Sequence, residues 1–173
     1  MAYLAIAGGI FVIDQTSKAW VTQSLHLGDD QSVIPGFLNF TYAQNPGVAF
    51  SMFDNLGDAG RLGLSILGLV ASTLVLYFLW RTQRTQLQVS GALALLLAGI
   101  LGNVADRIRL GFVVDFIDVQ LGSWHYDVFN LADAAICIGA VLLILDTIIG
   151  ARKKNNFAAT ILNPNRRGDR FES

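Results

Sequence analysis

The sequence predicts an α-helical integral membrane protein with four transmembrane helices, a small extracytoplasmic β-sheet and an interfacial outer loop or helix. Two observations carry this prediction. The chain of 173 residues is 53% hydrophobic and only 14% charged, and its mean hydropathy of +0.51 is high for a soluble domain. Its Lys and Arg residues also gather in particular connections between long apolar segments, as in proteins with a fixed membrane orientation.

Four apolar segments approach the ~20 residues that a spanning helix needs. They cover about residues 2–21, 62–80, 89–105 and 128–149. The second contains no charged residue, whereas the first carries Asp14 and Lys18 in its second half. The first segment has no basic beginning and leads into charged residues rather than a small-residue cleavage site. It is therefore predicted to be a retained helix and not a cleaved signal peptide.

Lys and Arg residues predict the orientation. Eight of them lie in the link after the second segment or in the C-terminal region: Arg81, Arg84, Arg152, Lys153, Lys154, Arg166, Arg167 and Arg170. The two long connections, residues 22–60 and 110–127, contain none. Both termini are thus predicted to be cytoplasmic and both long connections to be outside. Residues 1–154 form one predicted membrane domain, and residues 155–173 a flexible cytoplasmic tail.

The first outer connection has the composition of a sheet. Residues 33–34, 38–42 and 48–53 are rich in β-branched and aromatic residues, and Pro35-Gly36 and Asn45-Pro46-Gly47 separate them as turns. We expect a small antiparallel sheet over about residues 33–53 on the outer membrane surface. The second outer connection, residues 110–127, is apolar and aromatic and is expected to lie in the membrane interface.

Several polar residues sit inside or beside the apolar segments: Asp14, Lys18, Asn103, Asp106, Arg107, Asn130 and Asp133. With both termini inside, all of them fall near the outer face. Spacings of three and four residues place those of each segment on one helical stripe. Asp115, in the second outer connection, belongs at the same level. Ionisable groups at membrane depth are costly, so several at one depth indicate a functional site.

Structural roles are the alternatives for these residues. Asp14 and Lys18 form either a structural ion pair or part of a binding site. Arg107 lies on the outer side against the usual bias, which favours a local acidic partner, and Asp106 is next to it. An interfacial Arg that extends to the membrane surface is the other interpretation. For Asn103 and Asn130 the alternative is an amide bridge between helices. Asn130 and Asp127 are also the two candidates for the cap of the fourth helix.

Asp115 and Asp133 are least compatible with a purely structural role. Asp115 lies within the run Phe112-Val113-Val114-Asp115-Phe116-Ile117, where no solvated charge is needed, and Asp133 lies on the inward face of the fourth segment. Two neighbouring carboxylates in a partly dry site share one proton, because each charge raises the pKa of the other group. One can then act as general base and the other as general acid, as peptide hydrolysis by water requires.

Five ordered motifs carry a family resemblance. They are Asp14-Gln15-Thr16-Ser17-Lys18, Asn45-Pro46-Gly47-Val48-Ala49-Phe50-Ser51, Gly102-Asn103-Val104-Ala105-Asp106-Arg107, Gly111-Phe112-Val113-Val114-Asp115-Phe116 and Phe129-Asn130-Leu131-Ala132-Asp133. On four predicted spans of this orientation, the chain resembles the bacterial lipoprotein signal peptidases, or signal peptidase II. Val48 where the family often has Ala, and the absence of a Trp-Pro before the fifth motif, are small departures.

The resemblance implies a membrane aspartic endopeptidase of the bacterial inner membrane. It would cleave signal peptides from diacylglyceryl-modified prolipoproteins, just before the lipidated cysteine, and membrane lipid and the peptide antibiotic globomycin would be further partners. It implies Asp115 and Asp133 as the catalytic pair and no metal or organic cofactor. Substrate-binding or site-shaping positions would be Asn45, Gly47, Asn103, Arg107 and Asn130, and structural support would come from Asp14, Lys18 and Asp106.

Other functions fit the composition less well. The net charge of −1 argues against nucleic acid, and one cysteine with two histidines leaves little for a metal centre. There is no His-Glu-x-x-His motif for a metalloprotease. A small proton-coupled transporter or ion-binding membrane protein is the main rival, although no internal repeat is present and the polar residues lie at one face. An assembly partner that uses the outer sheet is the third possibility.

Overall fold

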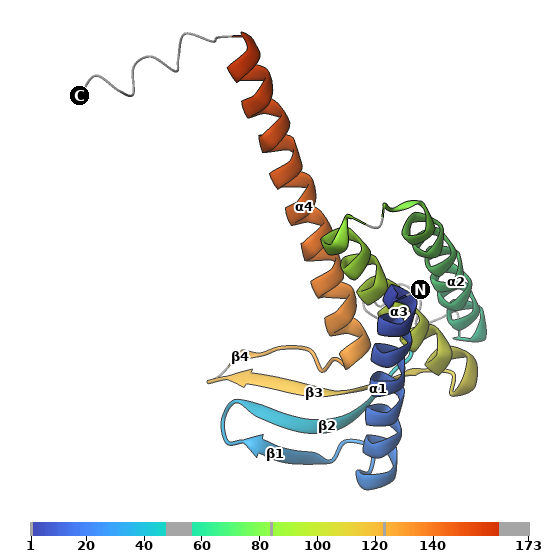
Figure 1. The fold of residues 1–173 in the computed structure, drawn as a ribbon. Coiled ribbons are helices and arrows are strands. Elements are labelled where there is room, and N and C mark those ends of the chain that lie inside the picture. Colours follow the sequence, from blue (N-terminus) through green and yellow to red (C-terminus); the bar gives the residue numbers. More distant parts are fainter. Residues whose placement is uncertain (1, 48–56, 84, 123, 163–173) are drawn as a thin grey trace.

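The structure is a computed structural model that describes residues 2–47, 57–83, 85–122 and 124–162. It contains four helices and four strands (Figure 1), which follow one another as α1 (Ala2–Ser24), β1 (Asp30–Ile34), β2 (Leu38–Asn45), α2 (Gly57–Arg81), α3 (Leu87–Arg109), β3 (Val113–Leu121), β4 (Trp124–His125) and α4 (Leu131–Leu162). Each of the four apolar segments predicted from the sequence is helical.

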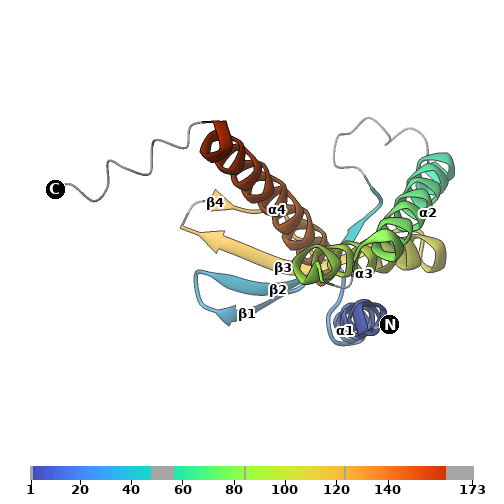
Figure 2. The same cartoon turned by 45° about the horizontal axis from the view of Figure 1, so that its top comes forward.

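Helix α3 is at the centre of the bundle. Figure 2 shows α2 and α4 on opposite sides of α3 and α1 on a third side. The surface of α3 that faces the other helices contains small residues, and Ala94, Ala98 and Gly99 are buried there. The outward surfaces of α2 and α4 are apolar; Leu67 is 64% exposed and Ile144 is 58% exposed. An apolar surface of this extent would be unfavourable in water and is typical of helices that face lipid.

Three helices of the described chain are long and apolar enough to cross a membrane. These stretches are Ala59–Arg81, Leu87–Arg109 and Leu131–Ala151. The protein is therefore a multi-pass membrane protein. Helix α1 has 23 residues, or about 35 Å of length at 1.5 Å per residue, but it carries the buried Asp14 and Lys18.

The strands form one antiparallel sheet in the order β1-β2-β3-β4. Residues 30–34 pair with residues 38–45 across a turn in which Gly36 has a positive φ of 73°. The antiparallel sheet predicted in the first outer connection is thus confirmed for its first two runs. The third predicted run, residues 48–53, lies outside the described residues.

The second outer connection differs from its prediction. We expected an interfacial loop or helix over residues 110–127, and this was wrong: residues 113–121 form β3, which pairs with β2 and brings Asp115 opposite Ala43. β-Branched and aromatic side chains favour a strand here, and β2 offers its free edge. One side of β3 also packs on α1, where Val114 and Phe116 form a buried cluster with Val21.

Helix α4 is longer than its membrane-length part, which ends at Ala151, because residues 152–162 are also helical. No Gly or Pro interrupts residues 151–162, and Pro164 follows, so the local sequence permits the helix to continue to this point. The flexible tail was predicted to begin at residue 155, so α4 extends into the first part of that predicted tail. The flexibility predicted for residues 163–173 concerns residues that the structure does not describe.

Gly99 allows the close approach of α3 and α4. A Cβ atom at this position would lie 2.3 Å from the carbonyl oxygen of Ala132 and 2.7 Å from a side-chain carbon of Ile136. We expect Gly99→Ala to lower the free energy of unfolding by about 1–3 kcal/mol, because the two helix backbones must separate. Denaturant unfolding in detergent micelles measures this.

The matched control is Gly63→Ala in α2, where an added Cβ would meet nothing within 4 Å. Ala has the higher helix propensity, so this change should be neutral or slightly stabilising. Equal stabilities of the two variants would show that the contact between α3 and α4 tolerates a methyl group.

Candidate active site

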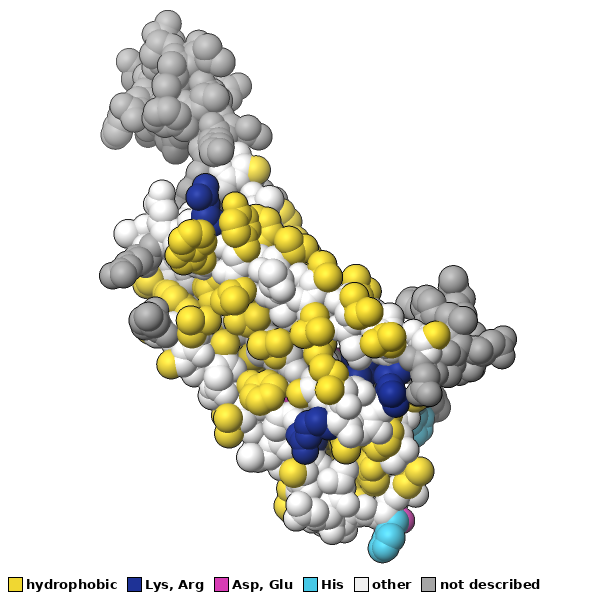
Figure 3. Space-filling model, turned by 90° about the vertical axis from the view of Figure 1, so that its right-hand side faces the viewer, with side chains coloured by type: hydrophobic (Ala, Val, Ile, Leu, Met, Phe, Trp, Pro, Cys, Tyr) yellow, Lys and Arg dark blue, Asp and Glu magenta, His cyan; other side chains and the backbone are white. Residues whose placement is uncertain are grey.

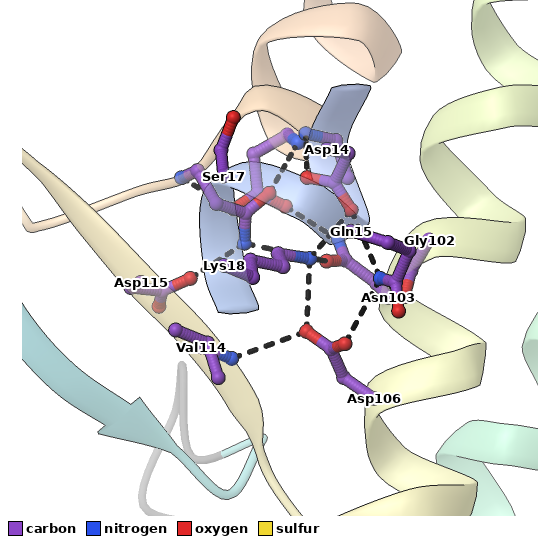
Figure 4. A network of polar contacts seen from close by, with 12 residues as sticks. Asp14, Gln15, Ser17, Lys18, Gly102, Asn103, Asp106, Val114 and Asp115 are labelled. Carbon is purple, nitrogen blue, oxygen red and sulfur yellow. Dashed lines mark hydrogen bonds and ion pairs between the residues drawn. The ribbon is translucent and has the colours of Figure 1, made fainter. Parts of the chain in front are cut away.

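Polar side chains from α1, α3, α4 and the sheet meet where the bundle joins the sheet. Figure 4 shows Lys18 of α1 extending toward Asn103 and Asp106 of α3, with Asp115 of β3 on its other side. The structure connects all ten predicted site residues through ion pairs and hydrogen bonds in which a side chain takes part, either directly or through one another: Asp14, Lys18, Asn45, Gly47, Asn103, Asp106, Arg107, Asp115, Asn130 and Asp133.

Lys18 is the centre of a buried ionic cluster. Its Nζ lies 3.0 Å from Asp14 Oδ2 and 2.9 Å from Asp106 Oδ2, and it donates a hydrogen bond to Asn103 Oδ1 at 3.1 Å. All three side chains of the ion cluster are at most 3% exposed. An ammonium group has three donors and no acceptor, so these contacts match its capacity.

The two carboxylates of this cluster also fix the ends of neighbouring elements. Asp14 Oδ1 accepts a hydrogen bond of 2.9 Å from the backbone N–H of Ala132, in the first turn of α4. Asp106 Oδ2 accepts one of 3.2 Å from the backbone N–H of Val114, in β3. The cluster therefore holds α1, α3, α4 and β3 in one arrangement, and these contacts agree with the structural support expected of its residues.

Gln15 and Arg109 belong to this network but were missed in the sequence. Gln15 Nε2 donates to Asp106 Oδ1 at 3.0 Å, and Arg109 Nη1 donates to Gln15 Oε1 at 3.0 Å. Because the guanidinium can only donate, it turns the oxygen of the amide outward and its nitrogen inward. A polar residue inside an apolar segment, next to Asp14, was the available signal for Gln15.

Asn130 is placed by the sheet and caps α4. The backbone of Phe129 pairs with Ile117 of β3, with hydrogen bonds of 2.7 and 3.1 Å, which brings the next residue beside Asp115. Asn130 Oδ1 accepts the backbone N–H of Asp133 at 2.9 Å, and Asp133 Oδ2 lies 3.3 Å from the backbone N of Asn130, which donates to it. This reciprocal pair is a capping box. Of the two predicted caps, Asn130 and not Asp127 has this role.

Three amide side chains donate hydrogen bonds to the two remaining carboxylates, Asp115 and Asp133. Asp115 accepts hydrogen bonds from Asn130 Nδ2 at 2.6 Å and from Asn45 Nδ2 at 3.0 Å. Asp133 Oδ1 accepts one from Asn103 Nδ2 at 2.7 Å. Asn130, which is fully buried, thus bonds to both aspartates.

The pKa of Asp115 is raised to about 6, chiefly because burial disfavours its charged form. The amide donors Asn45 and Asn130 act in the opposite direction, as does the charge of Lys18, while repulsion from Asp133 raises the pKa further. A carboxyl group with this pKa exchanges its proton near neutral pH, which suits acid–base catalysis.

This pKa predicts a pH-dependent stability. The folded pKa lies above the ordinary value of about 3.9, so the stabilisation is complete below about pH 4 and is lost as the pH rises through about 6. The loss is about 2–3 kcal/mol of unfolding free energy, since one pKa unit corresponds to about 1.4 kcal/mol. Asp115→Asn should lack this loss in denaturant titrations between pH 4 and 7.

The comparison between variants removes the contribution of other titrating groups. Asp118→Asn is the matched control, because Asp118 is also buried in β3 and bonds to Asn39 and Gln120. The control should keep the pH dependence of the unsubstituted protein. Parallel stability curves for the unsubstituted protein and Asp115→Asn would contradict the raised pKa.

Arg107 is bound differently from its prediction. Within the described part of the chain no carboxylate lies within 4 Å of its guanidinium, and Asp106 pairs with Lys18 instead, because Lys18 reaches the inward face on which Asp106 lies. Arg107 Nη1 is 3.4 Å from the carbonyl oxygen of Asn103, and its buried Nε has no partner among the described residues. Among the described residues, the remaining N–H groups of Arg107 thus have no hydrogen-bond acceptor.

Gly47 lies beside this guanidinium. It has a positive φ of 100°, and a Cβ atom there would be 2.2 Å from a side-chain carbon of Leu64 and 3.8 Å from Arg107 Nη2. Its backbone N–H donates to Asn45 Oδ1 at 2.8 Å, which leaves the amide nitrogen of Asn45 turned toward Asp115. Only glycine adopts this conformation readily.

A cavity of about 360 Å³ opens next to Asp133. Its walls come from the last two strands and the beginning of α4, and they consist of Val119, Trp124, Tyr126, Phe129, Asp133, Ala134 and Cys137. Asp133 is the one acidic side chain among these lining residues. An apolar cavity with a carboxylate at one end is suited to an apolar segment that carries a polar reacting group.

Fold and site together define a multi-pass membrane protein with a buried carboxylate site where the helix bundle meets a small sheet. Two bacterial membrane enzymes solved by the in meso method have this fold. One, at 2.3 Å resolution, has a TM-score of 0.74 and 28% identity and covers 99% of this chain and 94% of its own. The other, at 1.9 Å resolution, has a TM-score of 0.76 and 32% identity over 84% and 92%.

The sequence comparisons identify the family. The family described as Signal peptidase (SPase) II matches residues 6–149, and this chain belongs to it. Lipoprotein signal peptidase from Actinobacillus succinogenes is 41% identical over 90% of this chain and 95% of the relative. The protein of that name from Polynucleobacter necessarius is 42% identical over 83% and 87%.

Proposed function

We propose that this protein is an aspartic endopeptidase that removes signal peptides from diacylglyceryl-modified prolipoproteins by cleaving before the lipidated cysteine. The observation that carries the proposal is the shared buried amide of Asn130, which bonds to Asp115 and to the helix turn that holds Asp133. Membership of the signal peptidase II family and the names of the relatives support the substrate class.

The proposed chemistry uses the two carboxyl groups with one proton between them. The ionised aspartate takes a proton from water, and the resulting hydroxide attacks the carbonyl carbon of the scissile peptide. The protonated aspartate donates to the developing oxyanion, and the tetrahedral intermediate collapses as a proton passes to the leaving amine. The pair ends with one proton again, because water supplies the hydroxyl of the new carboxyl group and the hydrogen of the new amine.

The amides and Arg107 position the substrate in this proposal. Within the membrane boundary a peptide in extended form brings backbone groups that lack water, and each needs a hydrogen-bond partner. Arg107 has donors beside the site that no described residue engages. Asn45, Gly47, Asn103 and Asn130 shape the carboxylate surroundings and are the proposed substrate-binding positions, while Asp14, Lys18 and Asp106 are the proposed structural support.

In this proposal the chain has four spans with both termini in the cytoplasm, and the site lies at the outer face of the bacterial inner membrane. Helix α1 would be the fourth span, because its polar side chains Asp14 and Lys18 turn toward the bundle. The positions of three Trp side chains agree with the two membrane boundaries of this proposal. Trp20 and Trp124 are half-exposed near the sheet, and Trp80 is 80% exposed at the end of α2 farther from the sheet. Trp favours both interfaces of a bilayer.

The cavity beside Asp133 is the proposed site for the apolar part of the signal peptide. Its exposed thiol at Cys137 is the one cysteine of the chain, and it lies about one helical turn from Asp133. We expect a bulky maleimide at Cys137 to lower the cleavage rate at least about tenfold, because it fills the cavity. We also expect a bound substrate peptide to slow the labelling of Cys137 by the maleimide. Mass spectrometry of labelling together with cleavage rates tests this.

Cys137→Ser provides the control, since it has no thiol to react. It should keep its cleavage rate after maleimide treatment. Full activity of the completely labelled protein would exclude this cavity as the peptide site without excluding the dyad.

The decisive experiment is cleavage of a purified diacylglyceryl-modified prolipoprotein by the purified protein, followed by gel shift. We expect cleavage at one peptide bond, into the signal peptide and the lipidated mature chain, no cleavage of the unlipidated precursor, and inhibition by globomycin. Absence of cleavage together with uptake of a labelled solute into proteoliposomes would favour the transporter alternative instead.

A further inference from the structure

A second cavity lies on the other side of Lys18, at the end of the bundle nearest the sheet. It has a volume of about 270 Å³ and opens between α1, the last turn of α3 and β2. Gln15, Thr22 and Gln23 line it from α1, Arg109 from α3 and Tyr42 from β2. It shares no lining residue with the cavity beside Asp133, so it is a separate feature of the structure.

The mouth of this cavity offers hydrogen-bond donors. Arg109 is exposed and uses only Nη1, toward Gln15, within the described part of the chain. The hydroxyl of Tyr42 accepts a hydrogen bond from Gln44 Nε2 at 2.9 Å, so its own hydrogen remains to be donated. The exposed amide of Gln23 makes no side-chain hydrogen bond to the described residues. Such a group of donors fits an oxyanion with several acceptor oxygens.

Charge does not oppose an anion at this place. Lys18 and Arg109 together balance the two carboxylates of Asp14 and Asp106, and Asp106 is already bonded to Lys18, Gln15 and Val114. Arg109 is the exposed charge of this group, whereas the other three are buried, so the charge nearest the cavity mouth is positive.

An apolar groove of about 480 Å³ lies farther toward the N-terminus of α1, between α1, α2 and α3. Leu4, Gly8 and Phe11 line the groove, and Gln15, Lys18 and Thr22 line the cavity. These six residues follow one another at intervals of three or four and therefore form a single stripe of α1. Figure 3 shows hydrophobic side chains over the helical part of one side of the molecule, with Lys and Arg side chains interrupting them in its lower part.

We propose that the cavity and the groove together bind a glycerophospholipid, with its phosphate at Arg109 and Tyr42 and an acyl chain along the groove. The proposal rests on the membrane orientation given under Proposed function. Trp20 supports the depth, because it lies next to this end of α1, is 46% exposed and packs edge-on against Phe40 with ring centroids 5.7 Å apart. The lipid on a prolipoprotein cysteine is a diacylglyceryl group without phosphate, so the donors at the mouth distinguish a membrane phospholipid from the substrate.

Native mass spectrometry of the detergent-purified full chain tests this with phosphatidylglycerol as the probe. We expect a bound phospholipid on the unsubstituted protein and at least about tenfold weaker binding to Arg109→Gln, because a charge-assisted hydrogen bond is lost. Arg81→Gln is the matched control: it removes an exposed Arg at the far end of α2 and should bind as the unsubstituted protein does. Diacylglycerol should bind at least about tenfold more weakly than phosphatidylglycerol to the unsubstituted protein and to Arg81→Gln, and this difference should be smaller for Arg109→Gln.

A second variant tests the groove without touching the charge. A Cβ atom at Gly8 would meet nothing within 4 Å, so Gly8→Trp fills the groove with little strain and should also weaken phosphatidylglycerol binding. Equal binding by Arg109→Gln and the unsubstituted protein, or equal binding of diacylglycerol and phosphatidylglycerol, would overturn the proposal. The assay contains no peptide substrate, so failure of the proposed cleavage activity and failure of the lipid site are observed separately.

Discussion

Asp115→Asn and Asp133→Asn should each reduce prolipoprotein cleavage by about 10⁴-fold or to the detection limit, with the protein still folded. Each change removes a group that must take or give a proton, and such proton transfers contribute about 10²–10⁴-fold each. Because the two carboxyl groups act as one unit, either change alone should cost about as much as both together. Single-turnover cleavage of a diacylglyceryl-modified prolipoprotein measures the rates.

Asp118→Asn is the control for this experiment as well, because it changes a buried carboxylate of the same strand. It should keep cleavage within a few-fold of the unsubstituted rate. The thermal midpoints of all three variants in detergent show whether a loss of activity comes from unfolding. Processing at the normal rate by a folded Asp115→Asn or Asp133→Asn variant would exclude the proposed dyad.

Lys18→Met should lower the free energy of unfolding by about 3–5 kcal/mol. It leaves Asp14 and Asp106, both at most 2% exposed, without the cation that lies between them, and removing one member of a buried ionic group leaves an uncompensated charge. The loss should be larger than for Arg81→Met, which removes an exposed cation and should change stability by less than about 1 kcal/mol. Denaturant unfolding in micelles compares them.

A triple variant separates charge from packing. Lys18→Met combined with Asp14→Asn and Asp106→Asn leaves no charge in this ionic cluster, and Asn retains an acceptor oxygen for the backbone N–H groups of Ala132 and Val114. We expect it to be more stable than Lys18→Met alone. If the triple variant is the less stable of the two, the hydrogen bonds that the Asp14 and Asp106 carboxylates accept outweigh the cost of their unpaired charges.

The sequence predicted the helices and much of the polar cluster for physical reasons. Spanning helices have a fixed minimum length and exclude charge, so the long apolar segments could be recognised in the sequence as helices. The spacing of Asp14 from Lys18, and of Asn103 from Asp106, required a shared stripe on each helix, and the structure joins these stripes through Lys18.

The contact partners of the polar side chains and the pairing of the strands were harder to predict from the sequence. Arg107 follows Asp106 in the sequence, but successive side chains of a helix point about 100° apart. Asp106 therefore points away from Arg107 and forms its ion pair with Lys18. The run around Asp115 reads equally well as an interfacial segment or a strand, because apolar residues on both sides carry no alternation. Its pairing with β2, and the return of Phe129 to Ile117, depend on contacts between distant segments.

The capping box at Asn130 has a consequence for the order of biogenesis. Asn130 and Asp133 begin the last helix of the chain, and every other residue of the carboxylate site precedes them in synthesis. A nascent chain that has inserted only its first three helices has Asp115 without its second acid and without the amide that bonds to it. Folding of the first turn of α4 and completion of the site are one event, so proteolytic competence would arrive only with the final helix, and an incomplete chain would be harmless to lipoproteins in the same membrane.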